Sequence, residues 1–167
     1  VYNTQLGLTL SSMCSEPILE HGLQAYKDNE AHRRSEDFDM MVMTVIFTTG
    51  IVSGCMPGDY NSNIAHAICY GCATNEKTEK HHLHGEMVAY GLLILFAVDK
   101  QLDELKRWLP VYKAIGWPTK LSQLDLDESH IPQVVEKAVS VRDIVISPYE
   151  ITRDMLKDAI EYIESLS

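Results

Sequence analysis

Apolar residues recur at helical spacing along nearly the whole chain. In the first third they form two stretches, 2–14 and 16–31, followed by the more apolar segment 36–54. The Thr48–Gly50 end of that segment is also compatible with a strand, but its length favours a helix, because strands average about 5–6 residues. An apolar helix of this kind is usually central in a bundle. The pattern therefore predicts three helices here, the last of them buried.

Turn residues divide the rest of the chain. Met56-Pro57-Gly58-Asp59 is a turn signal, and Thr152 is a good N-cap for a final amphipathic helix. Further helices are predicted at about 63–69, 84–97, 101–115, 132–140 and from 152 onwards, with a polar connection at 75–82, a loop or short helical turn at 122–127 and an extended piece at 141–147. No strand, glycine-rich loop and helix follow one another as a nucleotide-binding unit requires. The expected fold is an all-α bundle of about seven helices.

Composition and charge limit the classes of function. The 167 residues suit one domain, and 46% of them are hydrophobic, which is enough for a core. The formal net charge is −10, and the only basic pair in the first half, Arg33-Arg34, is flanked by acidic residues. Because phosphate-backbone binding needs clustered Lys and Arg, we expect no nucleic-acid partner. No secretory signal or apolar run of about 20 residues is visible, so we expect a cytoplasmic protein with no membrane partner.

The four cysteines, Cys14, Cys55, Cys69 and Cys72, are expected to be unpaired in a reducing compartment. Cys69 and Cys72 have the C-x-x-C form. A second pair at zinc-finger spacing is absent from the sequence, and so is a strand–turn–helix context for redox chemistry. We interpret the two as small residues where a helix meets a turn.

His66 and His84 are the candidate metal ligands. Each lies in an apolar, helical context near a glycine. Two imidazoles from two helices form part of a divalent metal site, whereas catalytic zinc usually takes three protein ligands and a water. No third ligand stands out, because Glu86 points elsewhere on a helix that carries His84, and His81 and His82 are expected to be exposed. The alternative for each candidate is a hydrogen-bonded core histidine.

Two segments resemble a known enzyme family. Asn63-Ile-Ala-His-Ala-Ile-Cys-Tyr-Gly71 is similar to the A-H-A-[IV]-H-N-G segment of glycerol dehydrogenases and related iron-containing (group III) alcohol dehydrogenases. His84-Gly-Glu-Met-Val-Ala-Tyr-Gly91 is similar to their H-G-E-K-V-A-[FY]-G segment, and the spacing of the two histidines also fits. The stretch from Trp117 to Asp125 continues the resemblance more weakly, so that it covers most of the chain.

The resemblance implies a two-domain enzyme, of which residues 1–167 are the helical, dehydroquinate synthase-like C-terminal domain. In the family an N-terminal α/β domain binds NAD(P), and one Asp and two His hold zinc or iron between the domains. The two histidines map onto His66 and His84. The Asp belongs to a G-[IL]-G-D-x-L-A-K-W segment, and Val1 is expected to begin after it. The chain is thus expected to be a single metal-binding domain that lacks the nucleotide-binding domain and is inactive by itself, with no catalytic or nucleotide-binding residue assigned.

Three departures from the family pattern bear on the substrate. Cys69 replaces a frequent second histidine, Tyr70 replaces the Asn of Asn-Gly, and Met87 replaces the Lys of H-G-E-K. Residues 78–84 and 147–156 are more similar to the hydroxycarboxylate-dehydrogenase branch. The implied activity is oxidation of a small-molecule alcohol, either a polyol such as glycerol or a small hydroxy acid.

Two other interpretations stay open. The domain could serve a dehydroquinate synthase-like or glycerol-1-phosphate dehydrogenase-like enzyme, although few basic residues lie near His84 to bind a phosphorylated substrate. It could also be a stand-alone helical interaction domain that has kept the histidines of an enzyme ancestor. The apolar stretch 38–47 and the family resemblance both allow a homo-oligomer.

Overall fold

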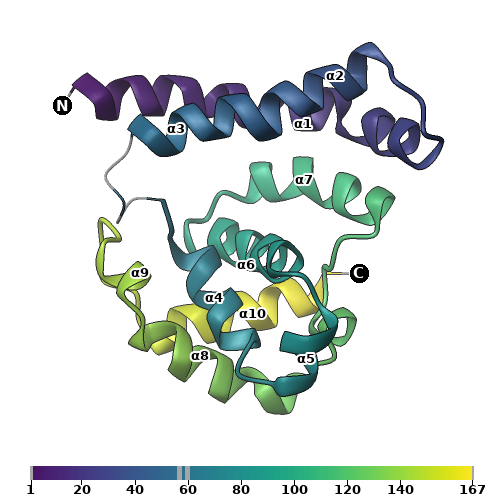
Figure 1. The fold of residues 1–167 in the computed structure, drawn as a ribbon. Helices are drawn as coiled ribbons and strands as arrows, with labels where there is room; N and C mark the ends of the chain where they lie inside the picture. The colour runs from purple at the N-terminus through teal and green to yellow at the C-terminus, as the bar shows by residue number, and fades with distance from the viewer. Residues whose placement is uncertain (1, 56–57, 59–60, 167) are drawn as a thin grey trace. The chain divides into compact units, whose positions relative to one another are not determined.

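The computed structural model describes residues 2–55, 58 and 61–166 (Figure 1). Every regular element in these ranges is helical, so the all-α prediction is confirmed. Of the turn predicted at 56–59, Gly58 alone lies within the described residues. The chain divides into two compact units, Val1–Asn61 and Ser62–Ser167. The single domain expected for residues 1–167 stays a prediction.

The first unit is a hairpin of two helical arms. Its first arm is α1 (Tyr2–Glu30), one helix where two were predicted, and Pro17 lies inside it. The second arm consists of α2 (Glu36–Val42), the π-helical segment η1 (Met43–Thr48) and α3 (Thr49–Cys55), which follow one another without a break. The helix predicted over 36–54 is therefore confirmed.

A buried carboxylate holds the turn between the two arms. Asp28 is 1% exposed and accepts hydrogen bonds from Gln24, Arg33 and Ser35. Ser35 in turn caps α2 by accepting from the backbone N–H of Phe38. The hydrogen bonds from Ser35 and Arg33 lower the pKa of Asp28 to about 2. One carboxylate thus links Gln24, Arg33 and Ser35 at the reversal of the chain.

The apolar second arm is not buried, and the prediction that it is central was wrong. Val45, Ile46 and Phe47 are 58%, 70% and 57% exposed. The run Glu36–Cys55 has the length and composition of a helix that could cross a membrane, which also corrects the expectation that no such run exists. Threonine, serine and glycine in its second half mask this apolar character in the sequence. Helical periodicity predicts the helix but does not specify its neighbours.

The second unit is built from many shorter helices around a packed core. Its elements are α4 (Ile64–Cys72), α5 (Glu76–His81), α6 (His84–Val98), α7 (Leu102–Ile115), the 3₁₀ segments η3 (Leu121–Leu124) and η4 (Glu128–His130), α8 (Ile131–Ser140), α9 (Arg142–Val145) and α10 (Arg153–Ser165). The helices predicted from about 63, 84, 101, 132 and 152 are confirmed. Gly116 ends α7 in the left-handed conformation, at φ 77°. Thr152 caps α10 as predicted.

Two short segments differ from their prediction. The polar connection at 75–82 contains α5, because the side chain of Asn75 accepts hydrogen bonds from the backbone N–H groups of Lys77 and Thr78. The hydroxyl of Thr78 is buried and donates to the carbonyl oxygen of Leu124, which anchors this helix. The piece predicted as extended at 141–147 contains α9, a single turn. Both helices are too short to show a periodic pattern in the sequence.

The core of the second unit is centred on α6. This helix packs against α4, α7 and α10, and α8 packs against α4 and α10 (Figure 1). Side chains from all five helices are fully or almost fully buried, including Ile68, Leu93, Ile94, Tyr112, Val134, Leu156, Ile160 and Ile163. The N-terminal ends of α4 and α6 are thereby fixed on a rigid base.

Candidate metal centre

His66 and His84 lie side by side, although 18 residues separate them in the sequence. Their ring centroids are 5.6 Å apart, and the ring planes are inclined at 44°. His66 lies in the first turn of α4, where the side chain of Asn63 caps the helix by accepting from the N–H of Ala65. His84 is the first residue of α6. The sequence therefore predicted the pair, and the structure brings its two members together.

A glycine determines how closely the two helices approach. A Cβ atom on Gly91 would overlap with the backbone carbonyl group of Ala65, the residue before His66. No side chain other than hydrogen fits at that contact, so α4 and α6 pack backbone to backbone. A second glycine, Gly71, makes a similar contact with the backbone of Val134 on α8. These contacts fix the position of α4 and with it the His66 side of the pair.

His66 has a ring nitrogen without a partner. Its Nδ1 is buried and has no hydrogen-bond partner among the residues that the structure describes. Leaving such a group unpaired costs about 1–3 kcal/mol. Burial and the neighbouring His84 lower the pKa of His66, and Asp143 opposes this shift. The ring is therefore neutral at neutral pH, which is the form that binds a metal ion. On both grounds His66 fits the role of a ligand.

His84 is exposed, and it contacts a buried thiol. Its Nδ1 lies 3.3 Å from the Sγ atom of Cys69, which is 1% exposed. Burial raises the pKa of the Cys69 thiol to about 11, so that the thiol is protonated at neutral pH. Cys69 and Cys72 are unpaired, and Cys72 is the last residue of α4, as predicted. Sequence reasoning missed the contact with His84. The sequence did contain a clue to it: Cys69 lies three residues after His66, which places both on one face of the helix.

Three polar residues close to His84 in the sequence, Glu86, His81 and His82, have other partners. Glu86 accepts a hydrogen bond from the backbone N–H of Leu83 at 2.8 Å, so it points away as predicted. His81 is exposed, but the side chain of His82 is 19% exposed, which corrects one of the two expectations. Both rings contact the carboxylate of Asp125, at 3.1 and 3.4 Å.

The carboxylate of Asp125 is also held by a lysine. Lys77 donates to this carboxylate at 2.6 Å, and that hydrogen bond is the main reason why the pKa of Asp125 falls to about 2. Across the described part of the chain, no group of three or more His, Cys, Asp or Glu side chains has the arrangement of a metal site. His66 and His84 are thus two candidate ligands without a third.

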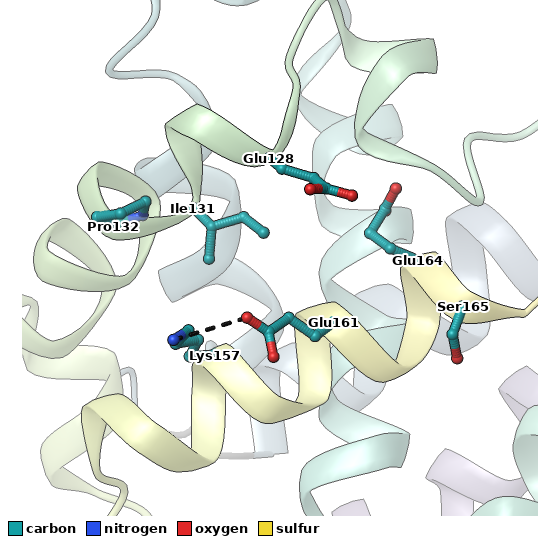
Figure 2. Close-up of a pocket in the computed structure, with 7 residues that line it drawn as sticks. All are labelled: Glu128, Ile131, Pro132, Lys157, Glu161, Glu164 and Ser165. Carbon is teal, nitrogen blue, oxygen red and sulfur yellow. Dashed lines mark ion pairs between the residues drawn. The ribbon is translucent and has the colours of Figure 1, made fainter.

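Neither His66 nor His84 lines the pocket between α8 and α10 in the second unit. This pocket of about 430 Å³ is lined by Glu128, Ile131, Pro132, Lys157, Glu161, Glu164 and Ser165 (Figure 2). Lys157 forms an ion pair with Glu161 there. Glu164 accepts hydrogen bonds from the Tyr90 hydroxyl and the backbone N–H of Leu121. Its carboxylate therefore contributes to the fold.

Comparisons with known proteins agree with this architecture. No family model matches the chain. It is 30% identical to hydroxycarboxylate dehydrogenase A of Escherichia coli over 96% of its own length and 45% of that protein, and 28% identical to glycerol dehydrogenase of Pseudomonas putida over 91% and 40%. The chain spans less than half the length of these curated relatives.

Solved structures show the same fold. A probable glycerol dehydrogenase from Sinorhizobium meliloti superimposes with a TM-score of 0.84 at 23% identity, over 96% of this chain and 45% of that one. Glycerol dehydrogenase from Schizosaccharomyces pombe also gives 0.84, at 19% identity, over 96% and 41%. The matching part is the C-terminal helical domain of such proteins, which confirms the fold expected from the sequence.

Proposed function

We propose that this chain, a homologue of the glycerol and hydroxycarboxylate dehydrogenases over their helical domain, supplies two histidine ligands to a divalent metal ion, zinc or iron. The ligands are His66 and His84. The observation that carries the proposal is the buried, unpaired Nδ1 of a neutral His66 beside a second imidazole. The enzyme would be an NAD(P)-linked dehydrogenase that oxidises a small alcohol, either a polyol such as glycerol or a hydroxy acid.

Each part of this arrangement has a defined task. When bound, the metal supplies Lewis-acid polarisation of the substrate hydroxyl, and hydride acceptance belongs to the nicotinamide. His66 contributes a ring that burial keeps neutral. The contact of Gly91 with Ala65 keeps α4 and α6, and hence both rings, in place. The proposed location is the cytoplasm, where thiols such as Cys69 stay reduced.

Two ligands are too few for a catalytic metal site, which usually has three from the protein. We place the third ligand, a carboxylate, and the nucleotide-binding domain outside these 167 residues. The curated relatives have more than half of their length beyond the part that this chain matches, which leaves room for both. The chain by itself is therefore expected to bind zinc weakly and to show no turnover.

The test replaces each histidine in a full-length dehydrogenase that carries this sequence. His66→Ala and His84→Ala are expected to lose the metal, measured by elemental analysis, and to lose alcohol oxidation. The loss should exceed the roughly 10–100-fold that changes around a ligand produce. His81→Ala is the matched control, because this exposed ring contacts Asp125 instead. Retention of metal and activity in both alanine variants would rule out the assignment.

Isothermal titration of the 167-residue chain with zinc tests the number of ligands. Weak binding that disappears in His66→Ala agrees with a two-ligand site. Tight, stoichiometric binding would show that a third ligand lies within the chain.

A further inference from the structure

The thiol of Cys69 touches His84 at two places. Its Sγ atom lies 3.3 Å from Nδ1 of the ring and 3.9 Å from the backbone carbonyl oxygen of the same residue. A thiol has one proton to donate, and its sulfur is also a weak acceptor. The carbonyl oxygen can only accept. The two contacts are satisfied together when the S–H donates to the carbonyl oxygen and the ring Nδ1–H donates to the sulfur.

This pattern of donors specifies the state of the ring. A neutral imidazole carries a proton on one of its two nitrogens, and the other nitrogen keeps its lone pair. With the proton on Nδ1, the lone pair of His84 is on Nε2. A metal ligand needs that free lone pair, together with a partner for the other nitrogen that fixes the ring orientation. A carboxylate or a backbone carbonyl often accepts the hydrogen bond from this other nitrogen, and in this chain a buried thiol does so.

We propose that Cys69 is a positioning residue, which holds His84 in the Nδ1–H tautomer and presents Nε2 as its metal-binding atom. Cys69 lies three residues after His66 on α4. The helix that offers one imidazole therefore also orients the other, which comes from α6. The role of Cys69 in metal binding rests on the proposed function, whereas its effect on the tautomer does not.

The tautomer is measured on the metal-free 167-residue chain. Two-dimensional ¹H–¹⁵N spectra of ¹⁵N-histidine-labelled protein, at about pH 8, distinguish Nδ1–H from Nε2–H because the protonated and unprotonated ring nitrogens differ in chemical shift. We expect His84 to be mainly Nδ1–H in the wild type. In Cys69→Ala it should shift towards Nε2–H, the form that histidine favours in water.

Two further variants separate positioning from packing. Cys69→Ser keeps a group that donates and accepts, and it is expected to restore the Nδ1–H form. Cys72→Ala removes the other buried thiol of α4, for which no contact with His84 is found among the described residues, and it should leave the tautomer unchanged. An unchanged His84 tautomer in a folded Cys69→Ala chain would overturn the proposal.

Cobalt titration then tests the consequence for metal binding. Cys69→Ala is expected to weaken Co²⁺ binding about tenfold, and Cys69→Ser should recover most of the loss. A thiolate-to-cobalt charge-transfer band in the wild type would make Cys69 a direct ligand and overturn its positioning role.

If the tautomer shifts as expected but neither the wild type nor a full-length protein binds metal, the positioning role stands and the proposed function fails. If binding is equal in the wild type and Cys69→Ala, the metal function stands and the positioning role fails.

Discussion

The two units of the chain stabilise their helices in different ways. In Ser62–Ser167, apolar side chains from all the long helices share one core. In the described part of Val1–Asn61, the buried positions are Gly7, Ala25, Asp28 and Thr44, while Val45, Ile46 and Phe47 are exposed. Long helices therefore form in both units, but a rigid core is present in one. The candidate ligands lie in the unit with the core, and a metal site needs that rigidity.

Truncation of a core side chain is expected to have the largest effect. Leu93 is 0% exposed, and Leu93→Ala should lower the free energy of unfolding of the second unit by about 3–4 kcal/mol through lost burial and the cavity left behind. Ile46, which is 70% exposed, provides the control, and Ile46→Ala should change stability by about 0.5 kcal/mol or less. Urea unfolding followed by hydrogen exchange in each unit measures both values. A large loss on Ile46→Ala would break the comparison, because it would mean that this side chain is covered in solution.

Replacing a glycine by alanine should change the free energy of unfolding in opposite directions in the two units. Gly91→Ala forces α6 away from the backbone of Ala65 and is expected to destabilise the second unit by about 2 kcal/mol. A Cβ on Gly50, in α3, meets nothing within 4 Å, so Gly50→Ala should stabilise the first unit by about 0.5–1 kcal/mol through helix propensity. Thermal unfolding monitored by circular dichroism gives both shifts. Equal effects at the two sites would contradict the close contact at Gly91.

Acid should weaken the first unit through Asp28. The pKa of this carboxyl is about 2 in the folded chain, against an ordinary value of 3.8. Because the folded-state pKa is lowered, the stability from the ionised form is fully present above about pH 4 and is lost as the pH falls towards 2. Asp28→Asn should remove this part of the acid dependence, as seen in urea midpoints at pH 6 and pH 3.

The matching change in the second unit is Asp125→Asn, since the pKa of Asp125 is also about 2. Its effect on the acid dependence of stability should be confined to the α5 region, where Lys77 and His81 hold the carboxylate. Hydrogen exchange resolves the two regions. An acid response of the first unit that is unchanged in Asp28→Asn would show that the turn does not depend on this charge.

The sequence predicted what is local and missed what depends on neighbours. Caps such as Asn63 and Thr152 act within three residues, so the starts of their helices could be predicted. The exposure of Ile46 could not, because the same apolar pattern serves a buried helix and an uncovered one. The segment 75–82 was predicted to be a connection because its helix is short and polar, and its main anchor is a bond from Thr78 to distant Leu124.

In the candidate site, too, the local features were predicted from the sequence and the contacts between helices were missed. The pair His66 and His84 was predicted from two motifs and their spacing. The contact of Cys69 with His84 depends on the rotation of α4 against α6, which no motif encodes. Likewise, the His82 side chain, which is 19% exposed, contacts Asp125, 43 residues away in the sequence.

The direct packing of α4 on α6 also has a consequence for the order of folding. The two imidazoles are separated by 18 residues, and the entropy of closing a loop rises slowly with its length. Contacts between neighbouring segments form sooner than those that require distant parts of the chain. We therefore expect the pairing of His66 with His84 to form in an early hairpin of α4 and α6, before the burial supplied by α10. The two rings would then lie together before the core of the second unit is complete.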